Sequence, residues 1–143
     1  MATEIRTVAI HLEHRIAATP ETVWNILTTR VGEWWSVPYR MFREGSNMTV
    51  DLRPGGGLIE QKGEAFVFWA LVTAVHPGKS LQLDGLSGPV QGRFTFSLAE
   101  DGHHTILTTD HTTIESAEVG EEEGYSGGWE HLANGLKQLA ETN

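Results

Sequence analysis

The sequence predicts an α+β fold in which one antiparallel sheet is covered by a C-terminal helix. Three observations lead to this prediction: an early segment with strong helix-start signals, about six strand-like segments separated by turns, and a final apolar pattern with a helical period. Strands joined by short turns must be antiparallel, because parallel neighbours need long crossover connections. One sheet with a segregated helix is an α+β arrangement, and we expect residues 1–143 to form a single domain of this kind.

The N-terminal elements come first. Residues 5–16 are rich in β-branched residues with charges mixed in, which predicts a first strand with one face in water. Thr19 then suits the N-cap of a helix, and Pro20 suits its first position. A second short helical turn is predicted over residues 31–35, ending before Pro38.

Strands follow from Met48 onward. The predicted segments cover residues 48–53, 58–61, 65–76, 80–86, 90–98 and 105–114, with turn residues such as Pro54-Gly55-Gly56-Gly57 between them. In the segment 90–98, apolar and polar residues alternate, so that Phe94 and Phe96 share one face and Arg93 and Thr95 share the other.

The last element is a predicted helix. Its apolar residues recur at steps of four, three, four and three, which places them on one helical face: Tyr125, Trp129, Leu132, Leu136 and Leu139. Gly124, Gly128 and Gly135 lie near one helical face although glycine is unfavourable in a helix interior. Close packing on the sheet and room for a ligand both explain these glycines at this point.

Composition excludes several classes of function. The formal net charge is −9, and no cluster of Lys or Arg is longer than two residues, so neither nucleic acid nor a membrane surface is an expected partner. The absence of cysteine excludes disulfides, thiol nucleophiles and iron–sulfur clusters. The first ten residues do not resemble a signal peptide, and the longest apolar stretch is far shorter than the roughly 20 residues that span a bilayer. We therefore expect a cytoplasmic protein.

Six stretches resemble a known superfamily when they are taken in order. They are residues 18–24 (Ala-Thr-Pro-Glu-Thr-Val-Trp), 34–35 (Trp-Trp), 51–56 (Asp-Leu-Arg-Pro-Gly-Gly), 72–77 (Val-Thr-Ala-Val-His-Pro), 107–111 (Leu-Thr-Thr-Asp-His) and 128–132 (Gly-Trp-Glu-His-Leu). Their order and spacing resemble the polyketide-cyclase and START-related superfamily (SRPBCC) over residues 5–140. Within it, they look most like the branch named for homology to the activator of the ATPase of the 90-kDa heat-shock protein.

The resemblance implies the helix-grip fold. In that fold a curved antiparallel sheet of six to seven strands wraps around a long C-terminal helix, and two short helices follow the first strand. It also implies a cavity between sheet and helix, which members of the superfamily use for lipids, hormones, polyketides and other apolar molecules. It does not imply one chemistry, because members include carriers, cyclases and receptors.

Apolar and aromatic residues on the inward faces are the candidate lining of such a cavity. The candidates are Trp35, Met41, Phe66, Trp69, Phe94, Phe96, Leu107, Thr109, His111, Trp129, Leu132 and Leu136. The alternative is that these side chains fill the core, because alternation predicts burial and not empty space.

His111 is the polar candidate, and the one candidate for catalysis. Counting by twos from Leu107 through Thr109 places it on the inward face. An imidazole there could orient a ligand carbonyl or act as a general base. The alternative is a buried histidine bonded to a neighbouring hydroxyl or carbonyl. Asp110 points the other way in a regular strand, so it is not expected to orient His111.

Other sites have weaker support. His11 and His14 face opposite sides of a strand and no histidine pair has the spacing of a helical metal site, so no metal and no cofactor are predicted. Arg40 and Arg43 could guard an entrance or anchor an acidic ligand, or form a solvated rim.

Three functions remain open from the sequence. The leading one is binding of a small hydrophobic molecule between sheet and helix, without catalysis. The alternatives are an enzyme of the cyclase, dehydratase or hydrolase type acting through His111, and a chaperone-accessory or regulatory protein-interaction module. Homodimerisation is left open.

Overall fold

A computed structural model describes residues 5–86, 90–116 and 122–142. Within these residues, seven strands form one antiparallel sheet: β1 (Ile5–Ile16), β2 (Asn47–Val50), β3 (Gly57–Lys62), β4 (Ala65–His76), β5 (Ser80–Gly85), β6 (Gly92–Asp101) and β7 (His104–Ser116). The helices are α1 (Pro20–Thr29), α2 (Val31–Trp34) and the long α3 (Glu122–Thr142), with a 3-10 turn, η1 (Val37–Tyr39).

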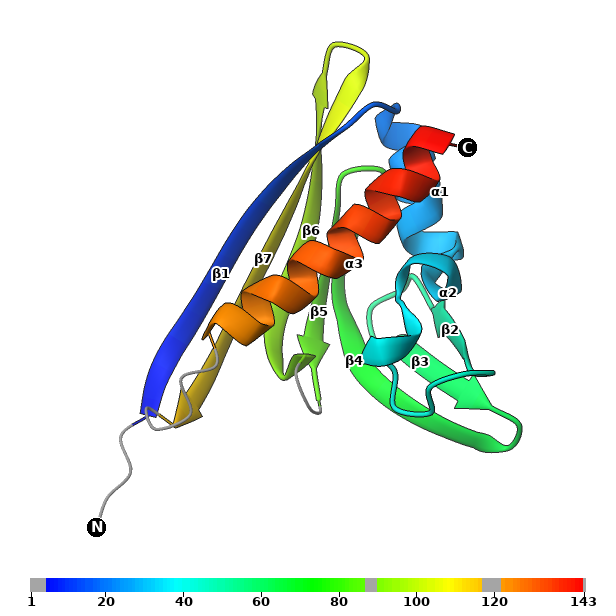
Figure 1. Ribbon diagram of the computed structural model, residues 1–143, viewed down its shortest axis with the longest axis vertical. Coiled ribbons are helices and arrows are strands. Elements are labelled where there is room, and N and C mark those ends of the chain that lie inside the picture. Colours follow the sequence, from blue (N-terminus) through cyan, green and yellow to red (C-terminus); the bar gives the residue numbers. More distant parts are fainter. Residues whose placement is uncertain (1–4, 87–89, 117–121, 143) are drawn as a thin grey trace.

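The sheet has the order β1-β7-β6-β5-β4-β3-β2, so the first strand pairs with the last. Figure 1 shows that the sheet curves around α3, while α1 and α2 cover the end near β2 to β4. This is the helix-grip arrangement, and it confirms the predicted α+β fold with a sheet wrapped around a C-terminal helix.

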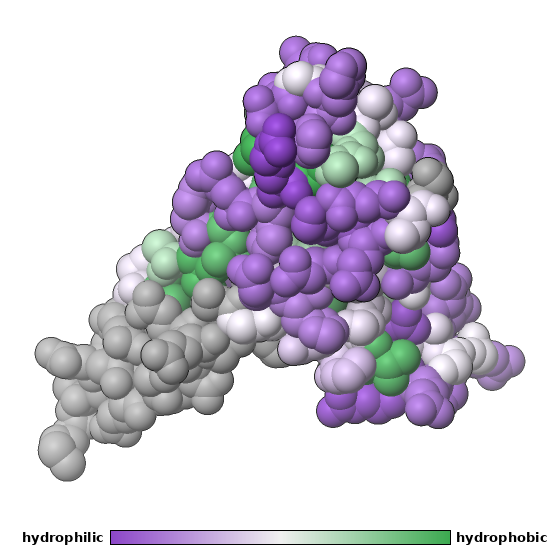
Figure 2. Space-filling model, turned by 45° about the horizontal axis from the view of Figure 1, so that its top comes forward, coloured by the Kyte–Doolittle hydropathy of each residue, from purple (hydrophilic) through white to green (hydrophobic). Residues whose placement is uncertain are grey.

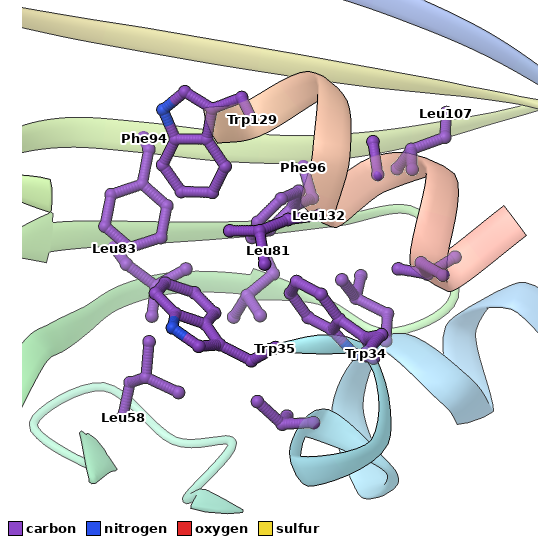
Figure 3. Packing of buried hydrophobic residues seen from close by; sticks show 14 of the residues in the cluster. Trp34, Trp35, Leu58, Leu81, Leu83, Phe94, Phe96, Leu107, Trp129 and Leu132 are labelled. Carbon is purple, nitrogen blue, oxygen red and sulfur yellow. The ribbon is translucent and has the colours of Figure 1, made fainter. Parts of the chain in front are cut away.

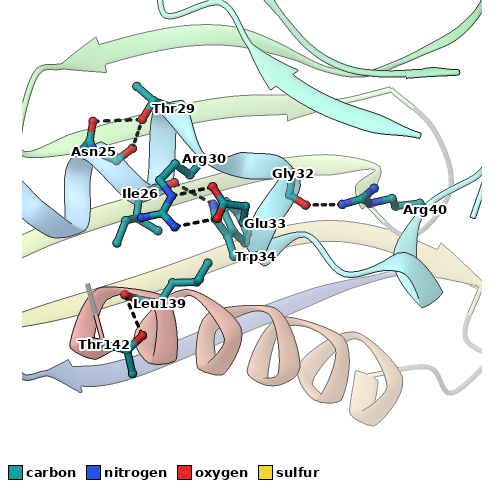
Figure 4. A network of polar contacts seen from close by, with 10 residues as sticks. All are labelled: Asn25, Ile26, Thr29, Arg30, Gly32, Glu33, Trp34, Arg40, Leu139 and Thr142. Carbon is teal, nitrogen blue, oxygen red and sulfur yellow. Dashed lines mark hydrogen bonds and ion pairs between the residues drawn. The ribbon is translucent and has the colours of Figure 1, made fainter. Parts of the chain in front are cut away.

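Local signals account for the start of α1. The hydroxyl of Thr19 accepts a hydrogen bond from the backbone N–H of Thr22 at 3.3 Å, and Pro20 takes the first helical position, as predicted. The helix ends at Thr29, and the backbone N–H of Arg30 still bonds to the carbonyl of Ile26 at 3.2 Å. Arg30 then forms an ion pair with Glu33 at 2.6 Å, which ties α2 to the end of α1 (Figure 4).

Strand alternation sorts β7 into two faces. Leu107, Thr109 and His111 are buried on the inner face under α3, as the two-residue period predicts. Asp110 lies on the outer face, where its carboxylate is 2.5 Å from Nδ1 of His11 on β1. His14, three residues farther along β1, is buried on the inner face, so the two histidines do face opposite sides.

Two strands start or end where backbone geometry requires it. β2 was expected to reach residue 53 but ends at Val50, because residues 51–56 form turns in which Gly55 has a φ of +89°. β6 was expected from residue 90 but begins at Gly92. The carbonyl oxygen of Val90 lies only 1.7 Å from where a Cβ of Gly85 would be, so the chain folds tightly over this glycine before the strand begins.

The C-terminal half of α3 covers the end of the edge strand β1. The ammonium of Lys137 donates to the carbonyl of Arg15 at 2.8 Å, and the carboxylate of Glu141 accepts from the backbone N–H of Ala17 at 2.8 Å. These bonds occupy backbone groups that an edge strand would otherwise present to solvent or to another chain. Among the described residues, no helix is both long enough and apolar enough to cross a membrane.

Candidate functional site

A cluster of aromatic rings fills the space between α3 and the sheet (Figure 3). The indole of Trp129 on α3 lies within it, with ring centroids 5.1 Å from Phe94, 5.8 Å from Phe96 and 6.0 Å from Trp35. The imidazole of His111 is the fourth neighbouring ring, and its centroid is 5.5 Å from that of the Trp129 indole. We call Trp35, Phe94, Phe96 and His111 the aromatic box, because their rings surround the indole of Trp129.

Sheet register brings three members of the box together. Phe94 and Phe96 are two residues apart on β6, so both face inward, and Phe94 pairs with His111 across to β7. Trp35 comes from the end of α2 and is 1% exposed. The box therefore joins the sheet, α3 and the α2 region, which are far apart in sequence.

Both ring nitrogens of His111 take part in hydrogen bonds. Nε2 is 2.9 Å from the carbonyl oxygen of Gln91, and Nδ1 is 2.9 Å from the indole nitrogen of Trp129. A carbonyl only accepts and an indole N–H only donates, so Nε2 carries the proton and Nδ1 accepts from Trp129. Burial lowers the pKa of His111 below its ordinary value of 6.5, although the bond to Gln91 acts in the opposite direction, so the ring is neutral at pH 7.

The other three buried tryptophans are also fixed by their indole N–H groups. Trp34 donates to the carbonyl of Ile26 at 3.2 Å (Figure 4), and Trp35 donates to the carbonyl of Tyr39 at 3.0 Å. Trp69 donates to the carboxylate of Glu60 at 3.0 Å. The ring centroids of Trp35 and Trp69 are 6.2 Å apart. Glu60 therefore orients the indole of Trp69, which lies next to the aromatic box.

Glu60 is a fully buried carboxylate that holds a loop as well as a tryptophan. Its two oxygens accept from the backbone N–H groups of Met41 and Phe42, each at 2.8 Å. Burial by itself would raise the pKa of Glu60. The hydrogen bonds from Phe42, Met41, Ser46 and Trp69 outweigh burial and hold the pKa below its ordinary value. Glu60 is thus a structural anion rather than an acid–base group.

Arg40 holds the same loop from the other side. Arg40 is 8% exposed, and its guanidinium donates to the carbonyls of Trp35 at 2.8 Å and Ser46 at 2.7 Å. It also donates to the carbonyl of Gly32 at 2.5 Å, the bond drawn in Figure 4. Arg40 was expected to guard an entrance, anchor an acidic ligand or lie on a solvated rim. It does none of these, because the turning chain places three backbone carbonyls around its donors. Arg43 donates to the carbonyl of Pro38 at the surface.

A small void remains beside the box. It has a volume of about 10 Å³, enough for the centre of roughly one water molecule. Its lining is apolar and consists of Leu27, Val31, Trp34, Trp35, Val50, Leu58, Leu81, Leu83 and Phe96. These nine described side chains therefore pack closely around the void, which by itself is too small for a ligand.

Ten of the twelve predicted lining residues are buried in this region: Trp35, Trp69, Phe94, Phe96, Leu107, Thr109, His111, Trp129, Leu132 and Leu136. Met41 and Phe66 are instead 56% and 67% exposed, so in this structure they do not line the interior. The backbone N–H of Met41 donates to the carboxylate of Glu60 at 2.8 Å, while its side chain is exposed. Whether the ten buried residues contact a ligand stays a prediction.

Sequence reasoning missed three features of the site. Trp34 was not among the candidate lining residues, yet it is 4% exposed, and its ring lies next to the rings of Trp35 and Phe96. His14 on β1 bonds to Glu130 on α3 at 2.7 Å. The hydroxyl of Thr109 is buried and has no hydrogen-bond partner among the described residues. Its inward position was predictable, but its lack of a partner was not.

The outer face of the sheet carries an open groove of about 550 Å³ lined by Asp84, Gly85, Gly92, Arg93, Thr95, Asp110 and Thr112. Arg93 forms two hydrogen bonds to Asp84, at 2.8 and 3.2 Å, which holds the pKa of that carboxyl below its usual value. Among the described residues, no group of three or more His, Asp or Glu side chains is arranged to hold a metal ion. Figure 2 shows a molecular face on which hydrophilic residues dominate and hydrophobic ones form small areas.

Comparison with known proteins gives a family match. The sequence model described as "Activator of Hsp90 ATPase homolog 1-like protein" matches residues 17–141. No curated protein sequence matches the chain significantly.

Several solved structures share the fold. The solution structure of the Aha1 dimer from Colwellia psychrerythraea has a TM-score of 0.72 at 16% identity, over 94% of this chain and 96% of the other. A conserved protein of unknown function from Enterococcus faecalis has a TM-score of 0.70 at 22% identity, over 98% of this chain and 77% of the other. CalU16 from Micromonospora echinospora has a TM-score of 0.67 at 22% identity, over 97% of this chain and 84% of the other.

Proposed function

Because this chain belongs to the family of activator of Hsp90 ATPase homolog 1-like proteins, within the SRPBCC superfamily, we propose that it binds a small hydrophobic molecule beneath α3. Proteins of the SRPBCC superfamily commonly bind hydrophobic ligands. The proposal includes one domain over residues 1–143, a cytoplasmic location and no catalytic reaction.

The observation that supports the proposal is the aromatic box around Trp129. Four rings enclose an indole whose centroid lies 5.1 to 6.0 Å from each of them. Ligand sites are typically apolar and aromatic with a few polar groups that fix orientation, and the box has this composition. A void of about 10 Å³ adjoins the box, and Trp35 and Phe96 line both of them.

The direct test is whether the purified protein holds or takes up an apolar molecule. Native mass spectrometry should find a co-purifying small molecule, or a neutral aromatic dye such as N-phenyl-1-naphthylamine should bind saturably at one per chain. Ligand at a hundred times its dissociation constant should raise the free energy of unfolding by about 2.7 kcal/mol. The proposal would be contradicted if no small molecule co-purifies with the protein and the dye does not bind saturably.

The enzymatic alternative has less support. A general base needs a lone pair that can reach the substrate, and Nδ1 of His111 is 2.9 Å from the indole nitrogen of Trp129. The buried histidine bonded to its neighbours is therefore the interpretation that we propose for His111.

Self-association is a second proposal. The Colwellia psychrerythraea relative with this fold is described as a dimer. Large apolar side chains are exposed on this chain, among them Tyr39, Met41, Phe66 and Leu86. Sedimentation velocity should then show a species of twice the 15.8 kDa chain mass that the substitution Phe66→Ser weakens. A monomer at all concentrations would exclude this proposal.

A further inference from the structure

Two polar atoms on the inner face of the sheet are buried without a hydrogen-bond partner among the described residues. They are the hydroxyl oxygen of Thr109 on β7 and Nδ1 of His14 on β1. Thr109 is 0% exposed and His14 is 8% exposed, so neither side chain is open to bulk solvent. Leaving a buried polar group unpaired is costly, and folded proteins contain few such groups. A bound molecule with a matching polar group would remove this cost at both atoms.

Sheet register makes the two residues diagonal neighbours. Thr109 lies directly opposite Leu12, two residues before His14 on the same inner face of β1. Side chains in this diagonal relation have β-carbons about 7 Å apart. The two polar atoms extend from those carbons and are not bonded to each other. A hydroxyl oxygen that lies about 2.8 Å from each of two atoms spans up to about 5.6 Å, which suits this spacing.

The bond between His14 and Glu130 decides which kind of group fits. Nε2 of His14 is 2.7 Å from a carboxylate oxygen of Glu130 on α3, and a carboxylate only accepts, so Nε2 carries a proton. In the neutral ring Nδ1 is then an acceptor. The hydroxyl of Thr109 can donate as well as accept. One O–H group therefore satisfies both residues, because it donates to Nδ1 of His14 and accepts from Thr109.

Apolar side chains flank the polar pair. Leu12 on β1 and Phe96 on β6 are the residues directly opposite Thr109 on its two neighbouring strands. Phe96 belongs to the aromatic box and also lines the void of about 10 Å³ beside it. The pair therefore adjoins the region proposed to hold an apolar ligand, and a few polar groups beside an apolar lining are what orients a ligand in such sites.

Resting on the proposed function, we propose that the ligand carries a hydroxyl group that binds between His14 and Thr109, with its apolar part toward Phe96. A ketone or an ether would satisfy Thr109 alone and leave Nδ1 of His14 unpaired. A carboxylate would also lack the donor, and it would lose its hydration. A water molecule has the same O–H chemistry, so the test compares ligands that differ in this group.

Calorimetric titration with a matched pair of probes tests the hydroxyl. 2-Naphthol has an O–H group, and its ether 2-methoxynaphthalene has the same rings and oxygen without the donor. We expect wild-type protein to bind 2-naphthol at least about tenfold more tightly, because the ether leaves a buried acceptor unpaired. In His14→Phe this preference should fall below about twofold, because the acceptor is gone. Glu130→Gln keeps the imidazole and an acceptor oxygen for Nε2, so it should keep the preference.

A matched pair of threonine variants tests the other half of the site. Thr109→Val keeps the shape of the side chain without its hydroxyl, and it should weaken the binding of 2-naphthol at least about fivefold. Thr105 is the control on the same strand and face, because its buried hydroxyl donates to the carbonyl of Ala18 at 2.8 Å. Thr105→Val should leave the affinity for 2-naphthol within about twofold of wild type.

Histidine NMR locates the hydroxyl in the protein. In a long-range 1H–15N spectrum, 2-naphthol should shift the Nδ1 signal of His14, because that atom gains a donor. The signals of His103, in an exposed turn, should stay in place. If His14→Phe does not fold, this shift, the two threonine variants and the preference of wild type decide alone.

The outcomes separate this inference from the proposed function. Equal affinity of wild type for 2-naphthol and its ether overturns the inference and leaves the proposed function standing, since water alone would then serve the two atoms. An unchanged affinity for 2-naphthol in Thr109→Val, or a His14 signal that does not move, overturns it as well, and so does saturable binding of the dye without binding of 2-naphthol. If neither the probes nor the dye bind and no molecule co-purifies, the inference and the proposed function both fail.

Discussion

Replacing Glu60 by glutamine should destabilise the protein far more than the loss of one charge at a surface would. Glu60 has 0% exposure, and the hydrogen bonds that it accepts include those from Met41, Phe42 and Trp69, at 2.8 to 3.0 Å. Glutamine has the same shape, but its NH2 group replaces one of the two acceptor oxygens. Either orientation of the amide therefore turns a donor toward the backbone N–H of Met41 or of Phe42.

The magnitude follows from the bonds that are lost. A hydrogen bond to a charged group contributes about 1.5–3 kcal/mol to stability. In Glu60→Gln at least one such bond is lost, and the amide NH2 group then faces a backbone N–H group, so that two donors oppose each other. We expect Glu60→Gln to lower the free energy of unfolding by about 3 kcal/mol at pH 7. Urea denaturation followed by far-ultraviolet circular dichroism measures this. The control is Glu64→Gln on the exposed β3–β4 turn, which should stay within about 0.5 kcal/mol of wild type.

The pH dependence supplies a second signature. The pKa of Glu60 is lowered in the folded protein, so its contribution is fully present above the ordinary value of 4.5 and is lost as pH falls through the folded value. The gap between wild type and Glu60→Gln should therefore narrow below pH 4.5. A Glu60→Gln protein as stable as wild type at pH 7, or a gap that stays constant on acidification, would refute this account of Glu60.

Three further predictions follow from single contacts. The free energy of unfolding of wild type should fall as pH drops below 6.5, by up to about 1.4 kcal/mol per pH unit, because His111 takes up a proton more readily in the unfolded chain than in the folded protein. Urea denaturation at pH 5 and 7.5 measures this fall, and His111→Gln should remove the contribution of His111 to it. Gly85→Ala should lower the free energy of unfolding by about 3 kcal/mol, because the new Cβ would lie 1.7 Å from the carbonyl oxygen of Val90. An unchanged melting temperature in thermal denaturation would contradict this and would show that the strand end can shift. Gly135→Ala should instead raise stability by about 0.5–1 kcal/mol, because its Cβ would meet a backbone carbonyl at 3.4 Å, an ordinary contact; a lower melting temperature would contradict this.

Local signals in the sequence were sufficient for the elements, and for the direction of side chains along them. The cap at Thr19 and the proline after it place the start of α1, and the two-residue period places His111 inward. The partners of His111 were not predictable. Gln91 and Trp129 lie 20 and 18 residues away in sequence, and the bonds to them depend on how the chain before β6 and the helix α3 meet.

Volume was the other quantity that sequence patterns could not give. The alternation of Phe94 and Phe96 predicts burial, but both an open cavity and a filled one satisfy it. Arg40 illustrates the same limit for polar groups. Its neighbours in sequence suggest a surface loop, whereas the fold surrounds it with three carbonyls that belong to residues five to eight positions away.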